Sequence, residues 1–429
     1  MPPPAPPPAS GAHAPTPDAV EGPASDAVRF VLRLGRAFHT CGAAAPRVEE
    51  VMGRAAQRFG LEGQFFTTPT SIFAGFGPDA RQRTHLLRVE PGEIHLERLS
   101  RLDEVIAALD VGRIAPEEGL ARIERIVGSQ PRYGTVALLL ASAVASAAAA
   151  RILGAGARGV TVAAGIGALV ALMSRGGEGR PALERVLVPL TAFVASALTT
   201  LAGRWAGPFS VHIVTLAGII ALLPGLALTN ALTEVSTNHL VSGTARLTGA
   251  FVTFVSLVFG VAMGRQVAGY DPARAAAEAG ALAGWTEWLA VAVASLAFGV
   301  LLRARRRDMG WIVASGLLVF VGGRIGARLL GPELGLFVGA LIAGLLSNLR
   351  GRLLGGSPIV TLAPSVLVLV PGSVGFRSLV ALLDREVLGG IELAFRTALM
   401  LTALVAGLLI ANIAVPVARR RLPAPRAFR

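Results

Sequence analysis

The chain has 429 residues, of which 53% are hydrophobic and only 16% are charged, and its mean hydropathy is +0.62. This composition is typical of a membrane protein and excludes a protein that is soluble over its whole length. All 40 basic residues are arginines, so a phosphate-binding loop of the GxxxxGK[ST] type is absent from the sequence, which argues against ATP-driven transport by this chain. The single cysteine, Cys41, allows no internal disulfide. We expect neither a metal site nor a cofactor.

The formal net charge of +13 could suggest a nucleic-acid partner. However, the arginines gather in the N-terminal third and at the ends of apolar runs, where flanking charge orients membrane helices. Taking the N-terminus as cytoplasmic places more arginines in the inside loops than in the outside loops, and the group at 303–307 is the strongest indication. We therefore expect a lipid bilayer and no nucleic acid as the partner, with the N-terminal region in the cytoplasm.

The first 130 residues of the chain differ from the rest. Residues 1–25 are rich in Pro and Ala and lack the basic start and apolar core of a signal peptide, so we expect a disordered tail. Residues 26–130 have the pattern of a small cytosolic α+β domain. Helices are expected around Phe30 to Phe38 and from Pro46 to Gly60, strands at 64–68, 71–76, 84–89 and 93–96, and two further helices at 101–109 and 116–126.

From residue 134 onward the apolar runs are long, and most approach the roughly 20 residues that span a hydrocarbon core. The sequence therefore predicts a mainly α, polytopic membrane protein of about ten transmembrane helices. The ten runs lie at 134–153, 159–174, 186–202, 210–226, 246–264, 283–302, 310–328, 333–349, 359–380 and 393–416.

These runs repeat. Pro224-Gly225 ends the fourth run, and Pro371-Gly372 interrupts the ninth 147 positions later. The same shift places other runs of the first half on runs of the second half. An odd number of spans per half predicts two five-helix repeats of opposite orientation, an architecture of secondary transporters. The predicted segments are a first repeat at 134–264, a linker at 265–282, a second repeat at 283–418 and a basic cytosolic tail at 419–429.

The segment 222–247 holds the densest polar patch among the apolar runs. Pro224-Gly225 breaks an apolar run, and Thr229, Asn230, Glu234 and His239 follow before the next run begins. Backbone that leaves helical form at membrane depth is tolerated where it is buried in protein or lines a watery cavity, and polar groups there usually serve a pathway. The segment is a candidate substrate site, and the alternative is an ordinary loop between two helices.

Several motifs resemble the threonine/serine exporter family, with both repeats fused in one chain. The soluble start carries GAAAPRVEE at 42–50 and TTPTSIF at 67–73. The first repeat carries PGLALTNALTE at 224–234 and SGTARL at 242–247, and the second carries PSVLVLVPGSVGFRSL at 364–379. The resemblance covers about residues 27–418. Glu234 stands where the family pattern leads us to expect Asp, which keeps the carboxylate but changes its reach.

The resemblance implies a multi-pass carrier of the bacterial inner membrane, not an enzyme, that exports threonine, serine or similar small hydrophilic solutes by antiport with protons. Relatives whose halves lie on two chains are associated with dicarboxylate export, so a succinate-like substrate is the alternative. A homo-oligomer is left open.

On this reading Glu234 takes and releases the coupling proton, with His239 and Arg246 in support. The ends of broken helices carry partial charges of both signs, which suits an amino acid's ammonium and carboxylate. The residues expected to bind the substrate are Pro224, Gly225, Thr229, Asn230, Pro371, Gly372 and Ser373.

Two readings from other classes stay open. A membrane-tethered hydrolase would have to use His39, Glu49, Glu50 and Thr68 of the soluble domain, but the sequence contains neither a G-x-S-x-G nor an H-E-x-x-H motif. Alternatively, the soluble domain is a sensor that gates the carrier.

Overall fold

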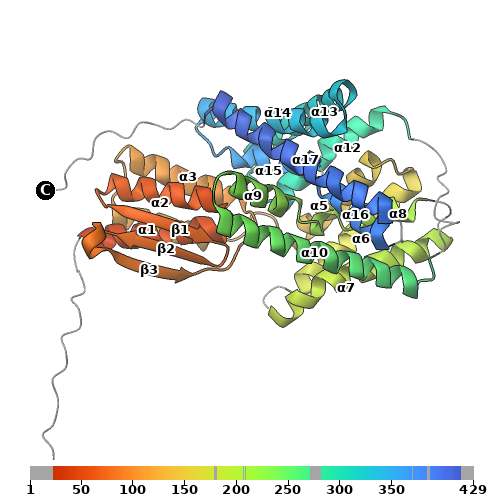
Figure 1. Cartoon of the computed structure of the whole chain (residues 1–429), viewed down its shortest axis with the longest axis horizontal. Helices are drawn as coiled ribbons and strands as arrows, with labels where there is room; N and C mark the ends of the chain where they lie inside the picture. The colour runs from red at the N-terminus through yellow and green to blue at the C-terminus, as the bar shows by residue number, and fades with distance from the viewer. Residues whose placement is uncertain are drawn as a thin grey trace, which may run out of the picture.

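The computed structural model describes residues 23–177, 181–205, 207, 209–270, 282–369, 371–383 and 387–416. The predicted tail 419–429, most of the tail 1–25 and the central part of the linker 265–282 lie outside these residues. Figure 1 shows two parts: a small α/β unit at one end and a long bundle of apolar helices next to it.

The α/β unit, which we call the N-terminal unit, is built from four helices around a three-stranded sheet. A buried core of large side chains, including Phe30, Leu34, Met52, Ile72 and Leu102, joins helices to sheet. Its elements are α1 (Pro23–Thr40), α2 (Ala45–Arg58), β1 (Gly63–Thr68), β2 (Ser71–Phe76), η1 (Asp79–Arg81), β3 (Arg83–Arg88), α3 (Leu96–Asp110) and α4 (Pro116–Val127).

The sheet is antiparallel with the order β1-β2-β3. Three of the predicted strands are confirmed, but the fourth, at 93–96, is wrong. Residues 89–95 form a connection, and Leu96 begins α3, where its backbone N–H and that of Glu97 bond to carbonyls of the two residues that follow a helix of the bundle. This long-range pairing overrides the local strand preference around Ile94.

The bundle is built almost entirely of long apolar helices. Its first half contains α5 (Thr135–Ile152), α6 (Ala157–Gly176), α7 (Pro181–Trp205), α8 (Val211–Gly218), η2 (Ile220–Leu222), α9 (Gly225–Ser236) and α10 (Leu240–Val267). Its second half contains α12 (Trp285–Leu301), η3 (Arg306–Asp308), α13 (Met309–Leu330), α14 (Pro332–Leu354), α15 (Ile359–Leu369), α16 (Pro371–Leu383) and α17 (Val387–Ala414).

Seven of the described helices are long and apolar enough to cross a membrane, and the bent pair of α8 with η2 and α9 raises this to eight. The bend between the two parts of that pair is 51°. Helices α12 and α15 are also apolar but shorter, with 17 and 11 residues. The mainly α membrane fold is therefore confirmed, whereas the predicted count of ten is not.

The two halves pack alike. α7 packs on α10 as α14 packs on α17, α6 packs on α8 as α13 packs on α15, and α9 packs on α10 as α16 packs on α17. The likeness extends to single residues. A Cβ at Gly260 of α10 would overlap the carbonyl oxygen of Pro189, and a Cβ at Gly407 of α17 would lie 2.5 Å from that of Phe337. Gly260 and Gly407 are 147 positions apart, the shift of the predicted repeat, and each lets two helix backbones approach closely.

Candidate functional site

A cavity of about 420 Å³ lies where the bent pair α8–α9 breaks, between the bundle and the N-terminal unit. We call it the near cavity. Its walls come from α5, α6, α9 and α12 and from the connection before α3. The polar side chains that line it are Glu93, Ser142, Ser174, Arg175, Asn230, Arg246 and Arg303.

Two of the predicted substrate residues line this cavity. Pro224 caps the start of α9, and Asn230 lies one and a half turns further along. Gly225 is buried as the first residue of α9, beside the cavity wall. Thr229 is buried and its hydroxyl donates to the carbonyl of Gly225 at 3.0 Å, so it bonds to its own helix. The break therefore falls at 219–224, and the segment after it is helical.

Glu234 lies at the joint between the bundle and the N-terminal unit. Its side chain is fully buried, and one carboxylate oxygen accepts from the backbone N–H of Ala45 at 2.9 Å. The other oxygen accepts from the hydroxyl of Ser242 at 2.8 Å, and Arg246 makes an ion pair with the carboxylate at 3.0 Å. Because Ala45 is the first residue of α2, Glu234 satisfies an otherwise unpaired N–H and lies at the positive end of that helix.

His239 makes a second link to the N-terminal unit. Its Nε2 lies 3.1 Å from the carboxylate of Glu49, whose other oxygen accepts from the backbone N–H of Thr67 at 2.8 Å. Sequence reasoning placed Glu234 and His239 in one polar segment but missed that both contact the N-terminal unit. The motif at 42–50, which contains Ala45 and Glu49, was the available signal.

A third link joins two helix ends. The backbone N–H groups of Leu96 and Glu97, at the start of α3, donate to the carbonyls of Leu302 and Arg303 at 2.9 and 3.2 Å. The carbonyls of the two residues that follow α12 and the first two N–H groups of α3 thus pair with one another. Tyr133 adds a hydrogen bond to the carbonyl of Ala304 at 2.9 Å. The N-terminal unit is therefore bound to both halves of the bundle.

The groups considered for a hydrolase are used in packing. His39 Nε2 lies 3.1 Å from the carbonyl of Thr68, and the Thr68 hydroxyl lies 2.7 Å from that of Ser71. Glu50 bonds to Arg47 at 2.7 Å, while Glu49 bonds to Thr67 and His239. The two carboxylates face different partners.

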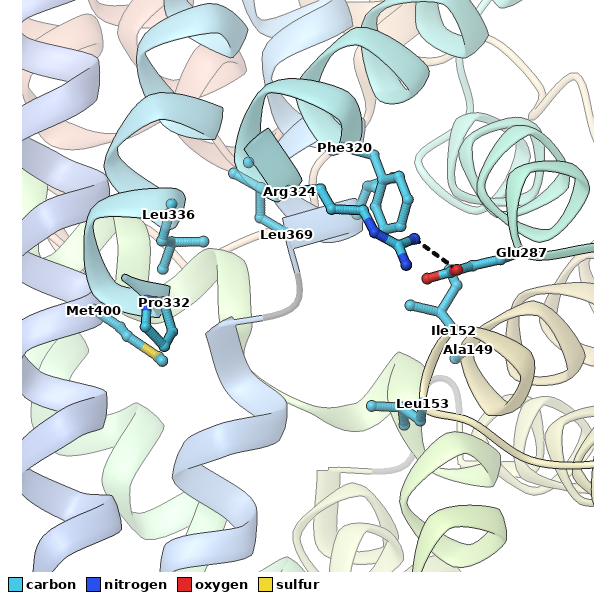
Figure 2. A pocket seen from close by; sticks show the side chains of 13 residues that line it. Ala149, Ile152, Leu153, Glu287, Phe320, Arg324, Pro332, Leu336, Leu369 and Met400 are labelled. Atoms are coloured by element: carbon cyan, nitrogen blue, oxygen red, sulfur yellow. Dashed lines mark hydrogen bonds and ion pairs between the residues drawn. The ribbon is translucent and has the colours of Figure 1, made fainter. Parts of the chain in front are cut away.

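A second cavity, of about 370 Å³, lies at the opposite end of the bundle. We call it the far cavity. Figure 2 shows Arg324 of α13 bonded across it to Glu287 of α12, with a distance of 2.6 Å between their side chains. Leu369, the last described residue of α15, also lines it. Backbone of the predicted Pro371, Gly372 and Ser373 begins α16, but their side chains lie outside the described residues.

One apolar cluster contributes a residue to the wall of each cavity, and we call it the barrier. Phe298 belongs to the barrier and lines the near cavity, whereas Val368 belongs to it and lines the far cavity. Most of its members are small, which lets α5 and α12 pack closely. The buried members are Ala145, Ala148, Ala290, Val291, Ala294, Ala297, Phe298 and Val368.

The charge state of His95 makes the stability of the N-terminal unit depend on pH. Burial, with help from Arg98 and Arg303, lowers the pKa of His95 to about 4, and its neutral Nδ1 accepts from the backbone N–H of Arg98 and caps α3. The unfolded histidine titrates near 6.5, so acid protonates the unfolded chain first and the folded state loses stability as pH falls from about 6.5 to about 4.

We expect the melting temperature to fall by several degrees between about pH 7.5 and pH 5. His95→Asn keeps a side-chain cap but does not titrate, so the melting temperature of this variant should decrease less between the two pH values. Thermal unfolding of the detergent-purified protein at the two pH values measures it. The same fall in His95→Asn would show that the acid sensitivity arises elsewhere, for example at His39, whose pKa burial also lowers.

The fold and these cavities define a multi-span membrane protein with one pocket toward each end of its helical bundle. Its sequence matches two family models, "Putative threonine/serine exporter" over residues 29–268 and "Threonine/Serine exporter, ThrE" over residues 287–414. The chain therefore belongs to the threonine/serine exporter family of membrane transporters, with both parts in one chain.

Curated relatives are distant. The chain is 25% identical over 371 residues to Pheromone-regulated membrane protein 10 of Candida albicans. This alignment covers 82% of this chain and 33% of that protein. It is 26% identical over 367 residues to the protein of the same name from Eremothecium gossypii. That alignment covers 82% of this chain and 48% of that protein. The chain thus spans between a third and a half of the length of these relatives. No solved structure matches it.

Proposed function

We propose that this chain is a secondary transporter that exports threonine, serine and similar small hydrophilic amino acids, by antiport with protons. The observation that carries the proposal is the pair of cavities toward the two ends of the bundle, with one member of the barrier in the wall of each. The near cavity lies at the break between α8 and α9, and Leu369 at the end of α15 lines the far cavity. A solute could cross the bundle if α5, α12 and α15 moved relative to one another.

We further propose ten spans in two inverted repeats: α5, α6, α7, α8 with α9, and α10, followed by α12, α13, α14, α15 with α16, and α17. Helix α5 begins beside the N-terminal unit, whereas α12, its counterpart by the shift of 147, ends there at the bonds from Leu96 and Glu97. Opposite directions at the same face are what inversion requires. The division into an N-terminal domain ending near 130, two repeats and a linker follows from the same assignment.

The N-terminal unit is proposed to lie in the cytoplasm, beside the inner membrane of a bacterium. The end of the bundle that contacts this unit carries Arg303, Arg305, Arg306 and Arg307. Cytoplasmic loops of membrane proteins carry an excess of arginine and lysine, so this cluster supports a cytoplasmic position. The near cavity would then open to the cytoplasm and receive the solute to be exported.

A coupling role for Glu234 stays a proposal. Its carboxylate has three partners here, Ala45, Ser242 and Arg246. Protonation would remove the charge that Arg246 and the start of α2 stabilise. Proton uptake at Glu234 would therefore loosen the N-terminal unit from α9 and α10, which offers a direct route from a proton to a conformational change.

A dicarboxylate is the second candidate substrate. Three guanidinium groups, those of Arg175, Arg246 and Arg303, line the near cavity, against the carboxylate of Glu93. Arg246 is paired with Glu234 and Arg175 also has a partner, so Arg303 is the arginine that would bind one carboxylate of such a substrate.

Reconstituted vesicles test the proposal. Purified full-length protein is expected to release preloaded radiolabelled threonine or serine, and to do so faster with an imposed proton gradient. Release of succinate alone would select the second candidate. Release of none of these solutes above that of protein-free vesicles would contradict the transport function.

A further inference from the structure

The near cavity contains charged side chains that the fold itself does not use. Arg246 pairs with Glu234, and Arg175 also has a partner. In contrast, the side chains of Glu93, Arg303 and Asn230 make no hydrogen bond or ion pair with any residue that the structure describes, although all three line the cavity. Groups of opposite charge without a protein partner in one cavity can pair with a ligand that carries both charges.

Arg303 is held in place by an unusual backbone. Its φ of 57° is in the left-handed region, which a side chain with a Cβ rarely adopts. The conformation is fixed by its own N–H, which donates to the carbonyl of Val300 at 2.9 Å, and by its carbonyl, which accepts from Glu97. Such conformations concentrate at functional sites. Here it turns the chain at the end of α12 and presents the guanidinium to the cavity.

Glu93 is equally well positioned, although it belongs to the N-terminal unit. On one side of it, a Cβ at Gly92 would overlap the carbonyl of Thr40, so this connection lies tightly against the end of α1. On the other side, the N–H of His95 donates to the carbonyl of Cys41 at 3.2 Å. The connection is therefore fixed at both ends, and the exposed carboxylate of Glu93 has a defined place at the cavity wall.

We propose that Glu93 and Arg303 bind the two ends of a zwitterionic amino acid, with the ammonium at Glu93 and the carboxylate at Arg303. Asn230 donates to the carboxylate or accepts from the ammonium through its amide. The N-terminal unit thus supplies one side of the substrate site. This inference rests on the proposed transport function and deepens it, because it names the residues that select the substrate.

The arrangement discriminates between the two candidate substrates. A dicarboxylate bound at Arg303 would bring its second negative charge toward the carboxylate of Glu93, and like charges that close repel each other. An amino acid replaces this repulsion with an attraction. Glu93 therefore acts as the specificity residue, whereas Arg303 serves any substrate with a carboxylate.

Binding and transport by the full chain in lipid vesicles test this, with labelled threonine and labelled succinate as the probes. Glu93→Gln should weaken threonine binding by about tenfold or more, while succinate binding stays the same or improves. Arg303→Gly should weaken both by about tenfold or more without lowering the melting temperature, because glycine adopts a positive φ freely. Glu90→Gln and Arg306→Gln, nearby charges that do not line the cavity, are the matched controls and should bind threonine as wild type does.

Unchanged threonine binding in Glu93→Gln or in Arg303→Gly would overturn the inference while leaving transport itself intact, provided that the wild type moves threonine. A wild type that moves succinate and rejects threonine would overturn the role of Glu93. A wild type that moves neither would remove the proposed function, and the inference with it.

Discussion

Replacing Glu234 with alanine is expected to abolish transport and to lower the free energy of unfolding by about 3 to 5 kcal/mol. The change leaves Arg246, whose side chain is only 16% exposed, without its counter-charge. It also removes the acceptor for the Ala45 N–H at the start of α2. Transport by reconstituted protein and denaturant unfolding in detergent measure the two effects.

Two further variants separate the structural role of Glu234 from a role in coupling. Glu234→Gln keeps an oxygen that can accept from Ala45 or Ser242, so it should fold, exchange substrate without a gradient and fail at gradient-driven export. Glu50→Gln, on the same helix as Ala45 but with a side chain 37% exposed, is the control and should change stability by about 0.5 kcal/mol or less. Normal proton-driven export by Glu234→Gln would contradict the coupling role.

Enlarging a barrier residue is expected to slow transport strongly while leaving the near cavity able to bind substrate. Ala294 on α12 is buried against the other small members of the barrier. Ala294→Leu should cost about 1 to 3 kcal/mol of stability through overpacking. We expect it to slow substrate release from vesicles by about tenfold or more, since an increase of about 1.4 kcal/mol in the activation free energy of transport suffices.

Leu296→Phe is the matched control for this change. Leu296 lies two residues along the same helix and is 45% exposed, so added carbon atoms there meet no packed neighbour. This variant should transport within about twofold of wild type. Equal slowing in both variants would point to a general defect of α12, and wild-type transport by Ala294→Leu would contradict the assignment of the barrier.

The sequence predicted the membrane class and most helices because hydrophobicity acts locally: each apolar run reports on its own burial. It predicted three strands for the same reason. It misplaced a strand at 93–96 because the bonds from Leu96 and Glu97 to the residues after α12 join positions about two hundred residues apart. Periodicity within a segment carries no information about such partners.

The same limit applies to the site. The cluster of Thr229, Asn230, Glu234 and His239 was visible as a polar patch after a helix break, and Pro224 and Asn230 do line the near cavity. The docking of Glu234 on Ala45 was not visible, since a carboxylate at a helix start leaves no periodic signal. Arg303 was visible only as one arginine in a basic group, because its positive φ depends on the contact with the N-terminal unit.

Thiol labelling from each side of the membrane tests the central claim, that the two cavities open to opposite faces. The native Cys41 is buried, which raises the pKa of its thiol to about 11 and leaves it unreactive, so the wild type serves as the unlabelled control. A membrane-impermeant maleimide should label Ala227→Cys in the near cavity only from the side of the N-terminal unit, and Leu336→Cys in the far cavity only from the other side. Labelling of both positions from the same side would contradict the account.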